Sequence, residues 1–410
     1  MNNTAKPTGF SSLLNHAFEG ENPSFSHAAP IYQSSAFRFD SAEGAAAAFA
    51  GEESAFIYTR LDNPNHSLVV KKVAALEGWD LLGGRPLNEI YQMVDGQLYA
   101  SGMAAISSAV YCCINQGDTL ICQQNIYGAT NQFLKQLAVK LNLKLVWVQG
   151  EDLTAWQQAF LENPQAKLAY AETPANPTLS IVDLSEVANL AHQYQAWLMV
   201  DNTFASPYNQ RPFNQGADVI IHSTTKYLSG HGVIIGGIVL SRHPEWVSEV
   251  LKPHAKLFGA TPSPFDAWLT NLGLKTYEIR MHQHNQNAQT VAEWLSSHPK
   301  IEAVYYPGLS THPGYETAKK QMYAFGGMLA FEVKGGLSSG KHLMDHLKMI
   351  SLVPTLGNCD TIVQHPASMS HVGVPREERL LSGITDGLVR FSTGIENAAD
   401  LIADLEQALG

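Results

Sequence analysis

Short apolar runs alternate with stretches of helical spacing between about residues 90 and 245. Each run is rich in apolar and β-branched side chains and gives way to polar residues, a pattern typical of strands. The runs are TLICQQN, KLVWVQG, KLAYAETP, WLMVDNT, DVIIHST and GGIVLS. Helical patterns such as DLSEVANLAHQYQ lie between several of them. Strands that alternate with helices predict a mainly parallel sheet that is buried on both faces.

The pattern changes after about residue 270. The segment RMHQHNQNAQTVAEWLSSHP predicts a long amphipathic helix. Its apolar face carries Ala288, Val291, Ala292 and Leu295. GGMLAFEVKGG predicts a strand, and AADLIADLEQAL predicts a final helix. We therefore expect an α/β protein with a large domain at 63–270, built on a mixed and mainly parallel sheet, and a smaller α+β domain at 271–410.

Two segments do not follow this alternation. Residues 1–62 are polar with few periodic stretches, and we interpret them as an extended N-terminal arm. Residues 79–98, WDLLGGRPLNEIYQMVDGQL, lie between a predicted helix that ends at ALEG and the small-residue run ASGMAAISS. We interpret this second segment as a surface excursion.

The composition is that of a folded globular enzyme, since 45% of the 410 residues are hydrophobic and 15% are charged. The net charge of -11 and the lack of a basic run argue against nucleic acid as a partner. No apolar run reaches the ~18 residues of a membrane span, and the N-terminus lacks a secretory signal. The four cysteines lack CxxC spacing, which favours reduced thiols in a cytoplasmic protein. We expect no metal site, because His282 and His284 point apart on a predicted helix.

Lys226 lies in HSTTKYLSGHG, directly after the predicted strand DVIIHS. Ligands of α/β sheets bind at the carboxyl ends of strands, and an amine desolvated there has a lowered pKa that suits Schiff-base formation. Asp201 ends the run WLMV in the same way, where a carboxylate needs a cation such as the pyridine nitrogen of pyridoxal phosphate. Each residue alone is more often a strand-end lysine or a turn aspartate. Their combination favours a cofactor site.

Two weaker signals indicate how a cofactor could be held. In ASGMAAISSAV, Gly102 frees backbone N–H groups at a helix start, which bind an anion well, and Ser223 and Thr225 could add hydroxyl donors. Tyr127, in NIYGAT, is a candidate for stacking on an aromatic ring. An ordinary helix start and a packed tyrosine are the alternatives.

Motifs spread over most of the chain then match one known family in order. They are SGMAAI, ETPANPT, VDNTFASPY, HSTTKYLSGHG, GATPSPFDAWL, QHPASMSH and LVRFSTGIE. From about residue 28 onward the sequence resembles the Cys/Met metabolism (trans-sulfuration) family of pyridoxal phosphate enzymes, in its γ-subfamily. This resemblance implies the fold type I of PLP-dependent transferases and pyridoxal 5'-phosphate bound covalently to Lys226.

The resemblance also implies roles for single residues. Lys226, Tyr127 and Asp201 match the catalytic residues: the lysine moves protons, the tyrosine stacks on the cofactor and acts at the γ-leaving group, and the aspartate faces the pyridine nitrogen. Arg390 and Thr355 match the residues at the substrate carboxylate, for which a bidentate guanidinium is well suited.

Further residues match the family's cofactor contacts. The phosphate cradle corresponds to Gly102, Met103, Ser223 and Thr225, and Asn176 corresponds to an asparagine near the cofactor's phenolate oxygen. Tyr58 and Arg60, in IYTRLDNPN, match a pair that binds the phosphate of the neighbouring subunit. The resemblance thus implies a homo-oligomer with shared active sites, expected to be a tetramer built of dimers, whose arm crosses the interface.

The expected reaction is γ-elimination of a sulfur amino acid to 2-oxobutyrate, ammonia and a thiol, because QHPASMSH and GITDGLVRFSTGIE are most similar to methionine γ-lyase. γ-Replacement of the O-acetylhomoserine sulfhydrylase or cystathionine γ-synthase type stays open, because that lyase has a cysteine where this chain has Ala129. Pro354 replaces a glutamate of cystathionine enzymes and disfavours cystathionine. A non-catalytic cofactor-binding oligomer is a remote third alternative. We also hypothesise that segment 79–98 reshapes the site entrance.

Overall fold

The larger of two sheets has seven strands in the computed structural model, which describes residues 9–19, 22–381 and 383–410. The strands are β1 (Asp95–Tyr99), β2 (Thr119–Gln123), β3 (Lys144–Val148), β4 (Leu168–Glu172), β5 (Trp197–Asp201), β6 (Val219–His222) and β7 (Gly237–Ser241). Their order is β1-β7-β6-β5-β4-β2-β3. β2 to β6 run parallel, whereas β7 is antiparallel to β6 and β1 is antiparallel to β7. The predicted mixed, mainly parallel sheet is confirmed.

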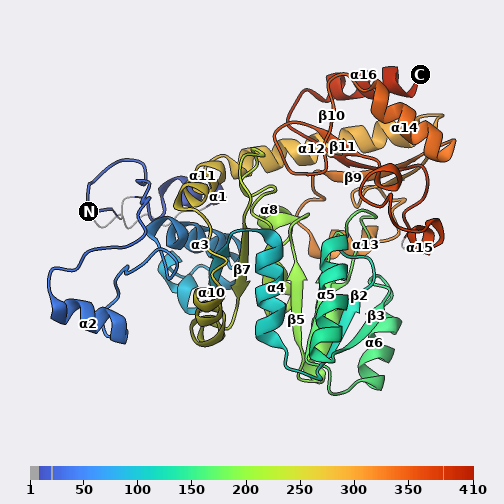
Figure 1. The fold of residues 1–410 in the computed structure, drawn as a ribbon. Coiled ribbons are helices and arrows are strands. Elements are labelled where there is room, and N and C mark those ends of the chain that lie inside the picture. Colours follow the sequence, from blue (N-terminus) through green and yellow to red (C-terminus); the bar gives the residue numbers. More distant parts are fainter. Residues whose placement is uncertain (1–8, 20–21, 382) are drawn as a thin grey trace.

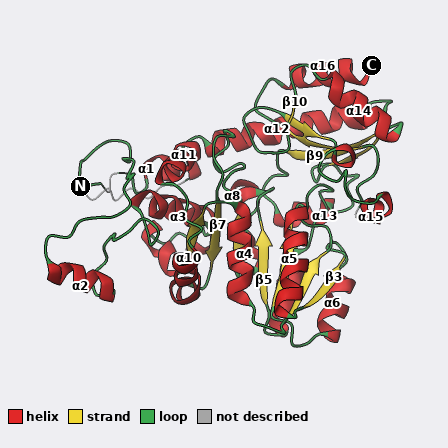
Figure 2. Ribbon diagram, viewed as in Figure 1, coloured by secondary structure: helices red, strands yellow, loops and turns green. Residues whose placement is uncertain are grey.

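Helices cover both faces of this sheet (Figure 1, Figure 2). On one face, α4 (Gly102–Cys113) and α5 (Gly128–Leu141) pack on a core that includes Tyr170 and Met199. On the other face lie α3 (Pro64–Glu77), α6 (Leu153–Glu162) and α7 (Leu184–Gln193). The central strands are apolar at successive positions because the side chains on both faces of the sheet are buried.

The second sheet has the order β10-β11-β12-β9-β8. Its strands are β8 (Ile301–Tyr305), β9 (Met328–Val333), β10 (Ser351–Leu352), β11 (Ile362–Gln364) and β12 (Leu388–Ser392). The helices α12 (Tyr277–Ser297), α14 (Gly336–His346) and α16 (Ala398–Leu409) pack against it. This arrangement of a sheet with packed helices is the α+β organisation that the C-terminal sequence predicts.

Six further helices connect these two parts or lie at the edges. They are α8 (Ser206–Asn209), α9 (Pro244–Trp246), α10 (Lys252–Phe258), α11 (Pro264–Leu274), α13 (Tyr315–Gln321) and α15 (Arg376–Leu381). The predicted domain boundary between 270 and 271 falls inside α11, so we propose to place the division at the turn between α11 and α12. None of the helices in the described ranges combines the length and the apolar character needed to cross a membrane.

The N-terminal region is only partly an extended arm. Helix α2 (Ala42–Ala50) stands away from the rest of the chain (Figure 1), and Phe49 on it is mostly exposed. Helix α1 (Phe10–His16) instead buries Phe10, Leu13 and Leu14 in the larger core. The sequence pattern did not reveal α1, because a helix this short shows little periodicity.

The interpretation of residues 79–98 as a surface excursion is wrong for its apolar positions. Residues 95–98 belong to the edge strand β1, which pairs with β7 from Asp95↔Ser241 onward. Ile90 and Val94 are fully buried in the larger core. The segment concealed this because two short 3-10 turns precede the strand and give no regular period.

A buried ion pair fastens the N-terminal segment to the larger core. Lys72 on α3 donates hydrogen bonds to Glu19 Oε1 (2.6 Å), to the Leu14 carbonyl (2.6 Å) and to Asn271 Oδ1 (2.8 Å). The Lys72 side chain is completely buried, and that of Glu19 is 6% exposed. All three donors of the ammonium group therefore have partners, which is the condition under which a buried charge is tolerated.

We predict that Lys72→Met lowers the free energy of unfolding by about 3 kcal/mol, because Glu19 then stays buried with only the more distant Lys275 as a cation. Urea unfolding followed by fluorescence measures this change. Lys320→Met is the matched control: its pair with Asp183 is half exposed, so its loss should cost less than about 1 kcal/mol. Equal losses in the two variants would contradict the prediction.

Candidate active site

Lys226 follows β6, and its amine meets a residue of the C-terminal part. Its Nζ donates a hydrogen bond to Thr355 Oγ1 at 2.8 Å. Burial, and next the positive charge of Arg390, lower the pKa of Lys226 to about 8. A substantial fraction of this amine is therefore neutral near physiological pH, which is the form that attacks a carbonyl.

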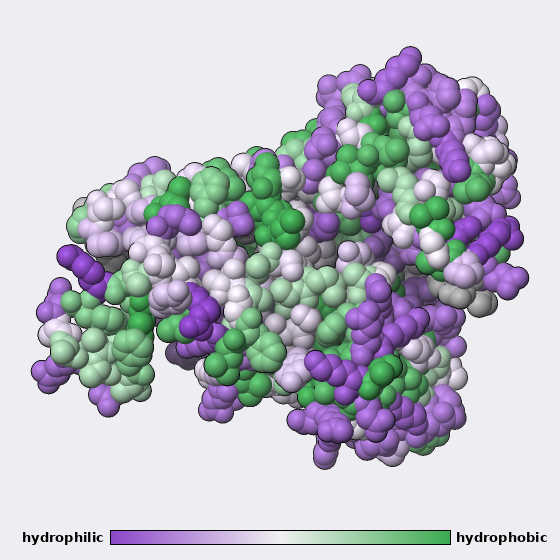
Figure 3. Space-filling model, in the orientation of Figure 1, coloured by the Kyte–Doolittle hydropathy of each residue, from purple (hydrophilic) through white to green (hydrophobic). Residues whose placement is uncertain are grey.

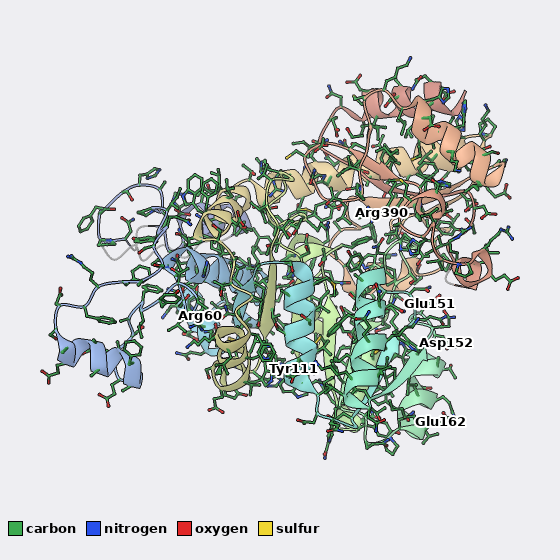
Figure 4. All side chains as sticks on the ribbon, in the orientation of Figure 1. Arg60, Tyr111, Glu151, Asp152, Glu162 and Arg390 are labelled. Carbon is green, nitrogen blue, oxygen red and sulfur yellow. The ribbon has the colours of Figure 1, made fainter. Side chains whose placement is uncertain are left out.

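Arg390 lies on β12, above the carboxyl ends of the larger sheet (Figure 4). Its guanidinium donates to the Thr355 carbonyl at 2.7 Å and to Asn176 Oδ1 at 3.3 Å. Burial lowers the pKa of Arg390 to about 10, and no carboxylate of the described residues forms an ion pair with it. A buried guanidinium with only neutral partners is suited to receive an anionic group of a ligand.

Asp201 and Glu172 end neighbouring parallel strands in register, so their side chains leave the same face of the sheet. Asp201 Oδ1 accepts the Thr203 N–H at 3.0 Å, and no cation of the described residues pairs with this carboxylate. Burial, and next the charge of Asp201, raise the pKa of Glu172 to about 8, and burial raises the pKa of Asp201 as well. A cation placed at Asp201 would relieve this accumulation of negative charge.

The start of α4 offers a site for an anion. Ser101 caps the helix by accepting the Ala104 N–H, and Gly102 begins it. A Cβ on Gly102 would lie 2.9 Å from the Ser223 Cβ, so only glycine lets this loop approach so closely. Ser223 and Thr225 follow β6 beside Gly236, whose N–H donates to Thr225 Oγ1 at 3.0 Å. Unpaired N–H groups of the first turn and two hydroxyls thus face one region.

Tyr127, Met103 and Asn176 complete this group. Tyr127 occupies the N-cap position of α5, is 44% exposed as a residue, and donates its backbone N–H to Glu172 Oε2 at 2.8 Å. The Asn176 N–H donates to the other oxygen of Glu172 at 2.8 Å. Met103 follows Gly102 in the first turn of α4 and receives a weak hydrogen bond from Thr130. These contacts join Tyr127 and Asn176 through Glu172 at the carboxyl edge of the sheet.

Tyr58 and Arg60 are the predicted site residues that the single chain does not bring to Lys226. The Arg60 guanidinium lies 5.6 Å from the centre of the Tyr58 ring and donates to the Lys256 carbonyl. Figure 4 shows Arg60 beside α10, well separated from Arg390. A role for these two residues in a neighbouring subunit stays a prediction.

Two buried glutamates near the site were not predicted. Glu172 ends the run KLAYAE in the same way as Asp201 ends WLMVD, and this likeness could have revealed it. Glu77, at the end of α3, accepts a hydrogen bond from Asn202 at 2.7 Å and lies 2.6 Å from His222 Nε2. Asp201 pairs with Ile221, and Asn202 and His222 are the next residues after these two. Because side chains alternate along a strand, Asn202 and His222 project to the opposite face from Asp201.

Comparison with known proteins identifies the family. A sequence model described as "Cys/Met metabolism PLP-dependent enzyme" matches residues 12–410. The chain belongs to this family. It is 45% identical to the L-methionine gamma-lyase of Porphyromonas gingivalis, over 98% of this chain and 97% of that protein. It is 44% identical to the L-methionine gamma-lyase of Fusobacterium nucleatum, over 98% of each chain.

A solved structure gives the same assignment of fold. Cystathionine gamma synthase from Xanthomonas oryzae pv. oryzae, in complex with cystathionine, superposes with a TM-score of 0.88 at 36% sequence identity. The match covers 98% of both chains. The expected fold of PLP-dependent enzymes is thereby confirmed, and so is the dependence of the family on pyridoxal phosphate.

The described residues fit pyridoxal phosphate. The N-terminus of α4, with Ser223 and Thr225, can hold a phosphate. Asp201 has no cation beside it among the described residues, and the protonated ring nitrogen of the cofactor would supply one. Lys226 offers an amine of lowered pKa to the aldehyde of the cofactor. These assignments of individual residues are predictions that rest on the chemistry of the donors present.

In cofactor-free protein, we predict that Lys226 is acylated with a pH midpoint of about 8, because only the neutral amine reacts and burial stabilises it. Brief acetic anhydride pulses at several pH values, read by peptide mass spectrometry, measure the midpoint. Arg390→Met should raise it by removing a nearby positive charge, and should leave it below that of an ordinary lysine because the burial remains. The exposed Lys320 is the internal control, and an equal midpoint for both lysines would contradict the prediction.

Proposed function

We propose that this chain is a pyridoxal-phosphate-dependent carbon–sulfur lyase that acts on L-methionine or a similar sulfur amino acid. The observation that carries the proposal is the contact of Lys226 and Arg390 with the same residue, Thr355. An amine with lowered pKa and a guanidinium without a carboxylate partner thus meet at one residue, where an amino acid could present its carboxylate to Arg390. The identity of 45% to a full-length L-methionine gamma-lyase supports this choice of substrate.

The residues divide the work between binding and proton movement. Arg390 binds the α-carboxylate of the substrate, and its bonds to Asn176 and Thr355 fix the plane of the guanidinium. The bound cofactor delocalises the negative charge that develops at Cα. Lys226 would hold the cofactor, and its amine would move protons at the substrate carbons within reach of its Nζ.

Tyr127 and Asp201 act on opposite ends of the reacting system. The Tyr127 ring would stack on the cofactor, and its hydroxyl would give a proton to the leaving sulfur. The Asp201 carboxylate would hold the ring nitrogen and favour its cationic form. The Cγ–S bond breaks, a proton completes the thiol, and water provides the oxygen of 2-oxobutyrate as ammonia leaves. Methionine and water are thereby converted to methanethiol, 2-oxobutyrate and ammonia.

A second candidate is γ-replacement, in which a thiol or sulfide adds where the leaving group departed. Ala129 favours it, because the resemblance to methionine γ-lyase implies a cysteine at this position, two residues after Tyr127. The similarity in fold to a cystathionine gamma synthase adds support. Both reactions require the same Lys226, Tyr127 and Arg390, so substrate tests must decide between them.

We also propose that two chains build each active site, in a cytoplasmic tetramer made of two dimers. Tyr58 and Arg60 line a cavity of about 360 Å³ on the surface, away from Arg390 (Figure 4). Hydrophobic side chains gather over α10 on the face seen in Figure 3, where Leu257 and Phe258 are largely exposed. A partner chain on this face would bury them and place Arg60 beside its cofactor phosphate. The free cysteines support the cytoplasmic location.

The proposed lyase should release 2-oxobutyrate from L-methionine alone, and Lys226→Ala should lower the rate roughly a thousandfold by removing the proton-moving amine. Cofactor-loaded protein and a coupled assay for the keto acid measure this. If loaded protein releases no 2-oxobutyrate but converts O-acetylhomoserine and sulfide, the lyase assignment fails and γ-replacement takes its place.

Shared active sites predict that two inactive variants restore each other. A mixed dimer of Lys226→Ala and Arg60→Ala chains has one site with both residues intact, so random reassociation should recover about a quarter of the wild-type activity. Refolding the variants together and separately supplies the comparison. If each site used Arg60 of its own chain, the mixture would gain no activity.

A further inference from the structure

Glu172 is a buried carboxylate with an unusual set of partners. It is 4% exposed, and its two oxygens accept the backbone N–H groups of Tyr127 and Asn176, each at 2.8 Å. No cation of the described residues pairs with it, and its neighbour in register is another carboxylate, Asp201. Burying a second negative charge beside the first is unfavourable unless the position needs it.

The two amides that Glu172 holds belong to different loops. Tyr127 follows β2 and starts α5, whereas Asn176 follows β4. The Gln123 side chain accepts the Glu172 N–H at 2.9 Å, which fixes the backbone of Glu172 itself. One carboxylate therefore sets the separation of the two loops on either side of the site.

Hydrogen bonds continue from Glu172 to the C-terminal part. Asn176 Oδ1 accepts from Arg390, Arg390 donates to the Thr355 carbonyl, and Thr355 Oγ1 accepts from Lys226. A displacement of the Asn176 loop would consequently reach the guanidinium, while a displacement of Tyr127 would move its ring.

We propose that Glu172 is a positioning residue of the active site, which clamps the Tyr127 and Asn176 loops so that the stacking ring and the substrate-binding Arg390 keep their spacing. This inference rests on the proposed function, because it assigns the cofactor to Tyr127 and the substrate carboxylate to Arg390.

Glutamate is the side chain that meets both requirements of this position. A carboxylate has two acceptor oxygens for two N–H donors, whereas the amide of glutamine would turn its own N–H₂ toward one of them. Aspartate keeps the charge but is one methylene shorter, so it cannot reach both amides.

Asp404 provides a matched control, because it is also a buried carboxylate that caps backbone N–H groups. It accepts those of Lys348, Met349 and Ile350, and none of its hydrogen bonds reaches a site residue. Asp404→Asn replaces a carboxyl that accepts backbone N–H groups by an amide, in the same way as Glu172→Gln. Any effect of Glu172→Gln that Asp404→Asn lacks is then specific to the site.

The experiment compares both variants with the wild type as cofactor-loaded proteins. We expect Glu172→Gln to weaken the visible circular dichroism of the bound cofactor at least twofold and to speed cofactor loss on dilution roughly tenfold, the effect of one hydrogen bond to a charged group. With a substrate that the wild type accepts, KM should rise roughly tenfold because Arg390 loses its alignment. Asp404→Asn should lower only the melting temperature. Glu172→Asp should resemble Glu172→Gln.

Unchanged circular dichroism, cofactor loss and KM in Glu172→Gln, with a lower melting temperature like that of Asp404→Asn, would overturn the proposal and leave Glu172 a structural cap. The first two measurements need no substrate. They therefore test Glu172 even if the protein fails to cleave methionine, and so separate this inference from the proposed function.

Discussion

The parallel register of β4, β5 and β6 is the constraint on which the site depends. It brings the ends of three apolar strands to one edge, so Glu172, Asp201 and the turn carrying Lys226 lie side by side. The strands are buried on both faces, and these polar groups leave the sheet where little water reaches them. Desolvation then becomes the largest influence on all three, raising the pKa of the carboxyls and lowering that of the amine.

The second sheet contributes a buried guanidinium, which the proposed function assigns to the substrate carboxylate. Arg390 projects from β12, and its contacts with Asn176 and Thr355 join the two sheets through neutral oxygens. Thr355 is central, because its hydroxyl meets Lys226 while its carbonyl meets Arg390. One residue of the connecting segment thus holds both the Lys226 amine and the Arg390 guanidinium by hydrogen bonds.

The sequence predicted the strands and helices that have a regular apolar pattern, and it missed the strand whose place depends on pairing with another strand. Strands β2 to β7 and helices α7, α12 and α16 follow continuous patterns and were found. Strand β1 was missed because DGQLY is short and follows irregular turns, so its place depends on β7. Lys226 and Asp201 were visible at strand ends, whereas the role of Glu172 required the register and the loops around it. The position of Arg60 far from Arg390 depends on tertiary structure that no local pattern encodes.

Arg390 and Asp201 carry opposite charges, and the fold nevertheless keeps them apart. Pairing them would favour stability, because a buried charge left without its partner costs about 3–5 kcal/mol. Instead Arg390 contacts neutral oxygens, and Asp201 contacts the Thr203 N–H. A ligand that presents a carboxylate at one end and a cationic nitrogen at the other would satisfy both. Substrate joined to pyridoxal phosphate has these two ends, so under the proposed function the unpaired charges serve binding rather than stability.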